Sequence, residues 1–189
     1  MQARVGFAMC GSFCTFERSI REMERLIDAG YEILPIMSDA AYSTDTRFGS
    51  AAVFRERIIS AAGKKIIHTI TEAEPLGPKV KLDLMIISPC TGNTLAKLAN
   101  GITDTPVTMA AMAHLRSDRP LLIALASNDA MSANVSNLGK LLTRKNIYFV
   151  PAAQDDPKAK PHSLVAEFER LPEAAGAALE GRQLYPLFI

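Results

Sequence analysis

Four short polar turns hold most of the residues in this chain that could bind a ligand. The turns are Gly11-Ser12, Ser38-Asp39, the loop from Cys90 to Thr94, and the segment from Ser127 to Met131. They offer hydroxyls, amides and backbone N–H groups, which suit a phosphate or the polar rim of a heterocycle. The central loop, residues 90–94, contains no lysine, so it is not a P-loop, and nothing in it indicates a bound metal ion.

Each turn taken alone also has an ordinary structural explanation. Thr91 or Asn93 could simply cap a following helix, and Ser12 could do the same after the first strand. Gly11 lets a ligand approach the backbone, while Ser12 places a hydroxyl near the positive end of a helix. The sequence GFAMCGS around these residues is not the GxGxxG fingerprint, so we do not expect a dinucleotide site of the usual kind.

Short apolar segments with the length of β-strands precede the turns. We expect strands at residues 4–9, 31–37, 82–88 and 121–126, and shorter ones at 64–70 and 147–150. The segment 82–88 has Asp83 as its only charge, which is typical of a strand buried on both faces in a parallel sheet. Pro89 is expected to end this strand, because proline has no N–H to give to the ladder.

Helical segments separate these strands. We expect helices at residues 15–29, 53–62, 95–100, 107–115 and 138–142, and over most of 163–181. Thr105 as N-cap and Pro106 in the first turn mark the start of one of them. The alternation of strands and helices predicts an α/β fold with a doubly wound, mainly parallel sheet in one domain, residues 1–189. All strands of such a sheet end at one edge, so the four turns can converge on one cleft, which favours a ligand site.

The composition excludes several classes of protein. Hydrophobic residues make up 48% of the chain and charged residues 22%, as in soluble globular proteins, and the net charge of +1 gives no indication of nucleic acid or an anionic membrane. No apolar run approaches the length of a membrane span, and the N-terminal segment lacks signal-peptide features. Three cysteines, Cys10, Cys14 and Cys90, fit reduced thiols of the cytoplasm better than disulfides or a zinc site.

The central loop and the residues after it resemble the flavoprotein family that includes phosphopantothenoylcysteine decarboxylase, lantibiotic cysteine decarboxylases and flavin prenyltransferase. The family's Pro-Ala-Ser-Ala-Asn-Thr loop is matched by PCTGNT at residues 89–94, and its Lys-x-Ala-Asn-Gly-Ile-x-Asp by KLANGITD at 97–104. Residues 126–131 replace the family's Pro-x-Met-Asn turn, where the decarboxylases recognise their substrate cysteine. That departure disfavours decarboxylation, and the Arg-Glu-Thr-Pro segment of the prenyltransferases is also missing.

A branch of this family from spore-forming bacteria is more similar still. Its members are flavoproteins that work with a second, different protein on a dihydropyridine dicarboxylate. The segments that carry this resemblance span nearly the whole chain in order: Gly11-Ser12, residues 46–49, 73–78, 91–93, 127–130, 145–147 and 154–157.

The resemblance implies a Rossmann-like, flavodoxin-type three-layer sandwich that binds FMN between the subunits of a homo-oligomer, a trimer or larger. It also implies a cytoplasmic oxidoreductase of sporulation, in the mother cell, whose partner protein binds NAD(P). We expect the cofactor to contact Gly11, Ser12, Phe13, Ser38, Thr91, Gly92, Asn93, Thr94, Ser127 and Asn128. His68 and Arg47 are the candidate catalytic residues, and Arg47 and Lys79, both in irregular loops, could bind the substrate carboxylates.

Two other functions fit the same sequence. The chain could be a non-catalytic flavin-binding assembly protein, with catalysis wholly in its partner, or an FMN-dependent decarboxylase of a small thiol acid. The helix after Pro106 bears on assembly, because Met109, Ala110, Met112 and Ala113 form an unusually apolar surface. An interface between subunits would explain that surface, and burial within one domain is the competing explanation.

Overall fold

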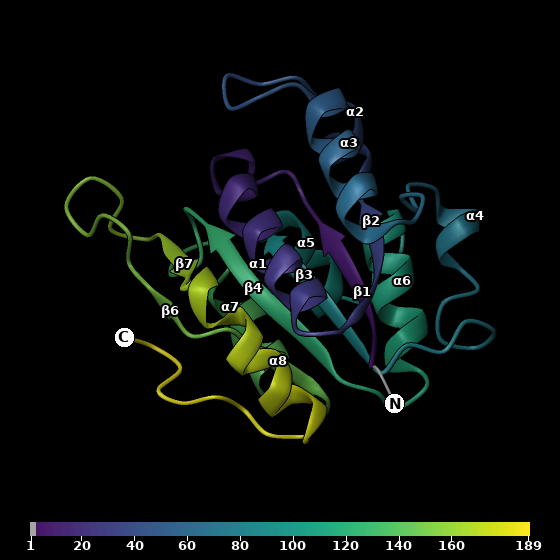
Figure 1. Ribbon diagram of the computed structural model, residues 1–189. Helices are drawn as coiled ribbons and strands as arrows, with labels where there is room; N and C mark the ends of the chain where they lie inside the picture. The colour runs from purple at the N-terminus through teal and green to yellow at the C-terminus, as the bar shows by residue number, and fades with distance from the viewer. Residues whose placement is uncertain (1–2) are drawn as a thin grey trace.

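The sheet is built from strands that alternate with helices along the chain (Figure 1). The computed structural model describes residues 3–189. Its strands are β1 (Arg4–Met9), β2 (Glu32–Met37), β3 (Leu84–Cys90), β4 (Leu121–Ser127), β5 (Ile147–Phe149), β6 (Ala152–Ala153) and β7 (Leu164–Ala166). The first five pair in parallel in the order β2-β1-β3-β4-β5, and β7 and β6 continue from the carboxyl end of β4 in antiparallel pairing.

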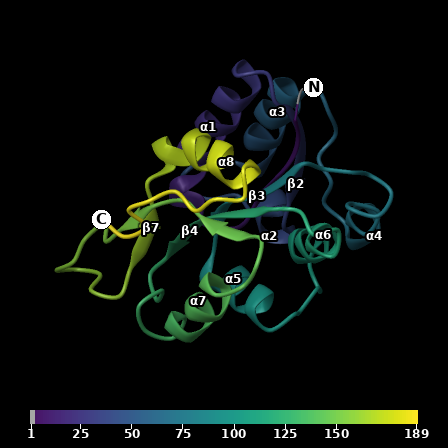
Figure 2. The same ribbon diagram turned by 90° about the horizontal axis from the view of Figure 1, so that it is seen from below.

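The helices form a layer on each face of the sheet (Figure 2). They are α1 (Phe16–Asp28), α2 (Asp39–Ser43), α3 (Ala51–Ala62), α4 (Ile70–Ala73), α5 (Gly92–Ala99), α6 (Pro106–Leu115), α7 (Val135–Leu142) and α8 (Leu171–Leu179), with 3-10 turns η1 (Phe13–Thr15) and η2 (Phe168–Arg170). Helices α1, α3 and α8 cover one face, and α5, α6 and α7 cover the other. None of the helices within residues 3–189 has the length and apolar character needed to cross a membrane.

The core follows from the two-residue period of the buried strands. Every residue of β3 is buried, with Leu84 and Ile86 in the cluster under α1 and α8, and Met85 and Ile87 in the cluster under α5 and α6. Because helices cover both faces, β3 does not need to alternate polar and apolar residues, as the sequence indicated. The predicted fold class, a flavodoxin-type three-layer sandwich with a mainly parallel sheet, is confirmed.

Residues 64–70 do not form the predicted strand. Ile67 makes a single parallel bridge to Ile36 at the outer side of β2, and the pairing stops there. Thr69 then begins α4 in a capping box with Glu72. The apolar run Ile66-Ile67 supplies burial for the sheet edge but is too short to extend the ladder, because a helix starts directly after it.

Pro89 does not end β3, which continues to Cys90. The register between β3 and β4 shifts between Ile87 and Cys90, so Pro89 lies at an irregularity where the ladder needs no N–H. Its carbonyl oxygen still accepts a hydrogen bond from the backbone N–H of Cys10 at 3.1 Å. The prediction that proline stops this strand was wrong for that reason.

The last predicted helix also needs correction. Residues 164–166 form β7, η2 follows, and α8 begins only at Leu171, where Pro172 occupies the first turn. Helices α5 and α7 begin at Gly92 and Val135 rather than at 95 and 138, and the short helices α2 and α4 were not predicted.

Candidate functional site

Three of the four polar turns line one cleft at the carboxyl edge of the sheet. They meet there because β1, β2 and β3 are parallel neighbours. The cleft has a volume of about 360 Å³, within the usual range for small-molecule sites. Its lining is Cys10, Gly11, Phe13, Ser38, Asp39, Ala40, Thr91, Asn93, Thr94, Lys97 and Thr105.

The turn after β1 offers unpaired backbone donors. Within residues 3–189, the N–H groups of Gly11, Phe13 and Cys14 donate no hydrogen bond. Ser12 does not cap a helix, because its side chain accepts no backbone N–H. The Thr15 hydroxyl instead donates to the Ser12 carbonyl oxygen at 2.8 Å. The turn therefore keeps its N–H groups available, which suits an anionic ligand group.

The turns after β2 and β3 are helix caps as well as cleft walls. Ser38 accepts the N–H of Ala41 at 3.3 Å and caps α2. Thr91 accepts the N–H of Thr94 at 3.3 Å and caps α5. Asn93 is exposed in the first turn of α5, and its side chain bonds to no other described residue. The capping explanation is thus correct for Thr91 and not for Asn93, which is free to meet a ligand.

Gly92 is the point at which the central loop packs against the turn after β4. A Cβ built on it would lie 2.7 Å from the Ser127 hydroxyl and 2.7 Å from the side-chain amide of Asn134. These distances are shorter than any normal carbon contact, so only glycine fits without moving its neighbours. Gly92 is buried, so its direct role in this structure is close packing between two turns.

The fourth turn opens on a second hollow beside the cleft. This hollow has a volume of about 310 Å³ and is lined by Ser12, Cys14, Thr15, Arg18, Ala126, Ser127, Asn128, Asp155, Lys160 and Val165. Gly11 and Phe13 face the cleft, whereas Ser12 and Cys14 face the second hollow. The predicted convergence on a single cleft is therefore incomplete, and Ser12, Ser127 and Asn128 lie on the other side of the residue 11–14 turn.

Charged groups at the cleft are few. Lys97 donates to the Asp104 carboxylate at 2.8 Å, so its charge is already paired. Asp39 is exposed at the wall. Lys97 and Thr105 were not among the predicted site residues, although Lys97 lies within the KLANGITD segment at 97–104 that carries the family resemblance. The cleft must therefore hold an anion mainly through neutral donors.

The thiol at the cleft floor is not a nucleophile near neutral pH. Burial raises the pKa of Cys10 to about 11, against a smaller opposing effect of its hydrogen bond from the Thr94 hydroxyl. Burial likewise raises the pKa of Cys90. Cys14 is exposed, and none of these three thiols forms a disulfide within residues 3–189.

His68 and Arg47 line neither the cleft nor the second hollow. The His68 ring stacks on Tyr42 with centroids 4.0 Å apart, and its Nδ1 lies 3.5 Å from the Glu72 carboxylate. The segment between α2 and α3 projects from the body (Figure 1). Arg47 is exposed in this segment, and its guanidinium lies over the Phe48 ring. Their predicted catalytic roles stay predictions.

Lys79 does not reach the cleft. Its loop packs against the carboxyl end of α6, where a Cβ on Gly77 would lie 2.5 Å from the Ala113 carbonyl oxygen. The cleft is at the opposite end of α6, at Thr105, and a ten-residue helix is roughly 15 Å long. The proposal that Lys79 binds a ligand in the cleft was therefore wrong.

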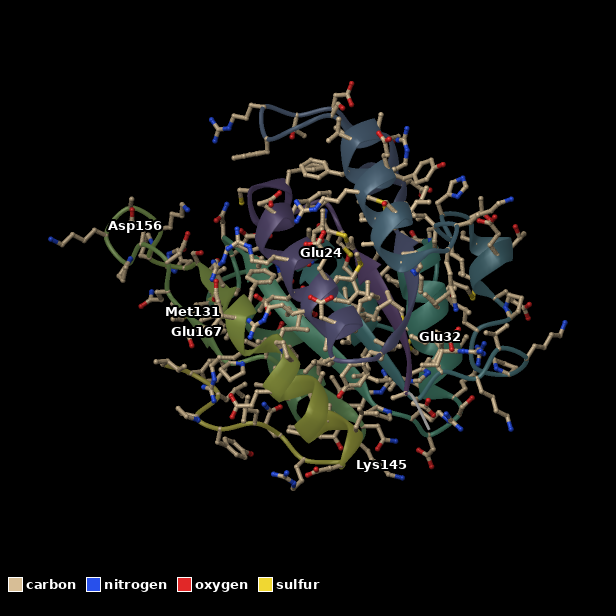
Figure 3. The ribbon with its side chains drawn as sticks, viewed as in Figure 1. Glu24, Glu32, Met131, Lys145, Asp156 and Glu167 are labelled. Carbon is tan, nitrogen blue, oxygen red and sulfur yellow. The ribbon has the colours of Figure 1, made fainter. Side chains whose placement is uncertain are left out.

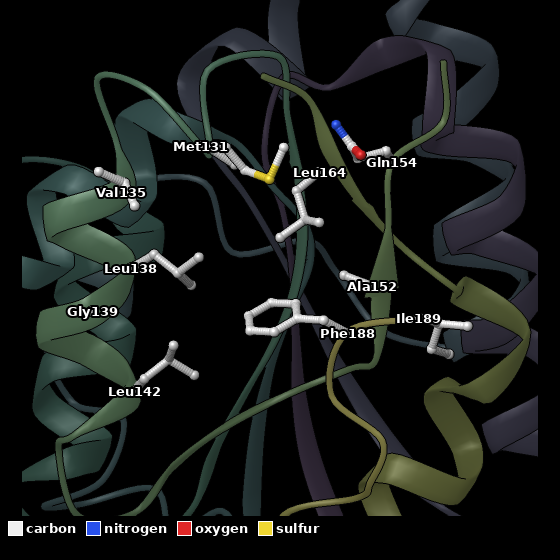
Figure 4. Close-up of a pocket in the computed structure, with 11 residues that line it drawn as sticks. Met131, Val135, Leu138, Gly139, Leu142, Ala152, Gln154, Leu164, Phe188 and Ile189 are labelled. Atoms are coloured by element: carbon white, nitrogen blue, oxygen red, sulfur yellow. The ribbon is translucent and has the colours of Figure 1, made fainter. Parts of the chain in front are cut away.

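A third hollow, of about 380 Å³, differs in chemistry from the other two (Figure 4). It lies between α7 and the C-terminal segment, with Val135, Leu138 and Leu142 facing Phe188 across it. Gln154 is its main polar side chain. Although it is the larger cavity, it lacks the donors that a phosphate or a carboxylate requires, so we place the ligand site at the polar cleft.

A parallel β2-β1-β3-β4-β5 sheet with a polar cleft at its carboxyl edge defines a nucleotide- or flavin-binding class of α/β protein. The chain belongs to the family described as Flavoprotein, whose profile matches residues 1–168. It is 44% identical over 186 residues to the B subunit of dipicolinate synthase from Bacillus subtilis (strain 168), covering 98% of this chain and 93% of that protein. The resemblance found in the sequence is thereby confirmed.

Solved structures agree with this assignment. The crystal structure of the dipicolinate synthase B subunit from Bacillus halodurans C has a TM-score of 0.91 and 42% identity, covering 100% of this chain and 98% of that chain. Burkholderia xenovorans DmrB, solved in complex with FMN, has a TM-score of 0.70 at 20% identity, with 95% of this chain and 96% of that chain covered. The second likeness concerns the fold alone.

Proposed function

We propose that this chain is the FMN-binding subunit of a dipicolinate synthase. It would oxidise dihydrodipicolinate to dipicolinate during sporulation, as a single-domain protein of the mother-cell cytoplasm. Its partner would be the A subunit of dipicolinate synthase, with NAD(P) bound to that partner. The similarity to the B subunit of dipicolinate synthase, which extends over 98% of the chain, carries this proposal.

The cleft residues fit a flavin mononucleotide. The turn after β1 supplies free N–H groups for a phosphate, and the first turns of α2 and α5 add others. A Cβ on Gly11 would find no protein atom closer than 3.5 Å, so the protein itself would accept alanine there. The open space at Gly11 would let a ligand approach the backbone there.

The residues of the chain would bind and orient the reactants. Bound FMN supplies two-electron oxidation chemistry, which the aromatisation of a dihydropyridine ring requires. Asn93 and Thr94 would contact the ribityl chain and ring system, and the buried, neutral thiol of Cys10 would add no competing nucleophile. His68 lines neither the cleft nor the second hollow of its own chain, so it would accept the substrate proton only where a subunit contact brings it to the site.

The decisive experiment is the absorption spectrum of the FMN-loaded protein under anaerobic conditions. Bleaching of the flavin by dihydrodipicolinate is the expected result. Release of carbon dioxide from a cysteine conjugate would favour the decarboxylase instead. An unchanged spectrum, together with undiminished activity of the complex with the A subunit after flavin removal, would favour the assembly protein.

Ser38→Ala should weaken FMN binding, because the Ser38 hydroxyl lines the cleft, whereas Ser12→Ala should leave it nearly unchanged, because Ser12 faces the second hollow. Loss of one hydrogen bond to a charged group corresponds to about 1.5–3 kcal/mol, or roughly ten- to a hundredfold in Kd. Flavin fluorescence titration measures the change, and Ser136→Ala on the exposed side of α7 is the control. Unchanged affinity in Ser38→Ala, or a loss in Ser12→Ala as large as that in Ser38→Ala, would contradict this placement of the phosphate.

We also propose a homo-oligomer of at least three subunits with FMN at the contact. Ala110 and Ala113 are fully buried within the chain, so burial inside the domain explains that half of the apolar surface. Met109 and Met112 remain partly exposed. Met112→Glu is expected to lower both the mass measured by light scattering and the bound flavin. A wild-type monomer saturated with FMN would contradict the proposal.

A further inference from the structure

The second hollow has a property that the cleft lacks, because two cations from distant parts of the chain line it. Arg18 comes from the first turn of α1, and Lys160 comes from the loop between β6 and β7. That loop extends from the body of the molecule, as the position of Asp156 within it shows (Figure 3). Neither cation was singled out by the sequence, since α1 has many charged residues and the loop has mixed charges.

The Arg18 guanidinium is held in place yet keeps donors free. Its Nε and Nη2 donate to the Glu169 carboxylate at 2.8–3.2 Å, and its plane lies over the Phe168 ring, 5.0 Å from the centroid. Its Nη1 donates to no atom in the described part of the chain. A guanidinium fixed on one edge presents its other edge in a defined direction, which suits a carboxylate.

The Lys160 ammonium is positioned in a similar way. Nζ donates to Asp155 at 2.7 Å, and the other Asp155 oxygen accepts the Ser163 hydroxyl at 2.6 Å. Those two hydrogen bonds keep the pKa of Asp155 below its usual value, so it stays ionised and continues to orient Lys160. An ammonium has three N–H donors, so two remain for a ligand.

The neutral groups of the hollow complete a site for a polar ring. Ser127 accepts the N–H of Asp129 at 3.3 Å through its hydroxyl oxygen, which leaves the hydroxyl proton free. Asn128 is exposed beside it and makes no hydrogen bond to residues 3–189. A volume of about 310 Å³ can hold one six-membered heterocycle with its substituents.

We infer that this hollow is the dicarboxylate subsite, in which Arg18 and Lys160 bind the two carboxylates of a pyridine or dihydropyridine ring. The residue 11–14 turn lies between this hollow and the cleft, so FMN bound in the cleft would have to extend its ring past this turn to contact the substrate. The identity of the dicarboxylate rests on the proposed function. Arg18 and Lys160, in place of Lys79, would then recognise the charge of the substrate.

Cys14 makes the site accessible to a direct binding test. It lines the hollow and is exposed, whereas Cys10 and Cys90 are buried. Iodoacetamide is uncharged and should alkylate one thiol per chain in the native FMN-loaded protein, as read by mass spectrometry. Dipicolinate at saturation, with EDTA present to exclude chelated metals, should slow that alkylation by about tenfold or more, because the ligand covers the thiol.

Charge-removing variants test the two cations. Lys160→Gln and Arg18→Gln should each raise the dipicolinate concentration needed for protection by roughly ten- to a hundredfold. Lys158→Gln, on the same loop, and Arg21→Gln, on the same helix, are the controls, because neither residue lines the hollow. In both, dipicolinate should protect Cys14 at the same concentration as in the wild type. Pyridine-2-carboxylate should protect much less, since its single carboxylate can engage only one cation. Inorganic phosphate should also protect much less, since it has no ring to cover the thiol.

The outcomes separate this inference from the proposed function. Flavin bleaching by dihydrodipicolinate without protection of Cys14 would overturn the subsite and leave the function intact. Protection of Cys14 that depends on both cations, without bleaching, would support the subsite and count against the oxidation. Equal protection by phosphate or pyridine-2-carboxylate, or protection unaffected by either variant, would also overturn the inference.

Discussion

Replacing Gly92 by alanine should weaken FMN binding by at least about tenfold while the sheet stays folded. The added methyl would lie 2.7 Å from the Ser127 hydroxyl and the Asn134 amide, so both side chains must move. Asn134 accepts a hydrogen bond from Asn137 at 3.0 Å, and Ser127 accepts one from Asp129, so movement breaks the turn after β4. Overpacking of this kind costs about 1–3 kcal/mol. Flavin titration and thermal unfolding measure the two effects.

Gly139→Ala is the matched control for this variant. Gly139 is also in a helix, α7, but a Cβ there meets no atom within 4 Å. Alanine in a helix interior is favoured over glycine by about 1 kcal/mol, so this variant should be slightly more stable and bind FMN normally. If Gly92→Ala binds FMN as tightly as Gly139→Ala, the contact between the two turns does not shape the cleft.

Local signals in the sequence were sufficient for much of the fold. Thr105 and Pro106 predicted the start of α6 correctly, because capping chemistry depends only on neighbouring residues. The same chemistry at Thr69 and Glu72 could have revealed α4, and Pro172 could have revealed the start of α8. Those two signals lay inside segments whose apolar residues suggested a longer element.

Features that depend on pairing partners could not be predicted in this way. The shift between β3 and β4 that admits Pro89 into a strand depends on the neighbour, which a single strand does not specify. β7 is a strand because β4 and β6 each offer it an antiparallel edge. Its three residues, 164–166, carry no periodicity long enough to indicate a strand.

The candidate site shows the same division between local and distant information. The turns at strand ends were recognisable, because residue type and strand position together place them at one edge. Their division into a cleft and a second hollow was not, since it depends on which way successive residues of the 11–14 turn point. The pairing of Arg18 with Glu169 spans 151 residues, and no local pattern connects two such positions.

The largest loss of stability is expected for Gly77→Ala. Gly77 has φ +96°, which side chains other than glycine rarely adopt, and an added Cβ would lie 2.5 Å from the Ala113 carbonyl oxygen in α6. The backbone of a helix cannot rotate away as a side chain can, so the cost of the positive φ adds to the cost of the steric clash. We expect the free energy of unfolding to fall by more than about 3 kcal/mol.

Gly101→Ala separates these two costs, because Gly101 has φ +72° but open space around its Cβ. It should lose only the conformational part, about 1 kcal/mol. Urea unfolding of both variants measures the difference, and equal losses would show that the loop around Gly77 yields instead of displacing α6. A displaced α6 would also move Thr105 at the cleft, so Gly77→Ala should weaken FMN binding even where the protein remains folded.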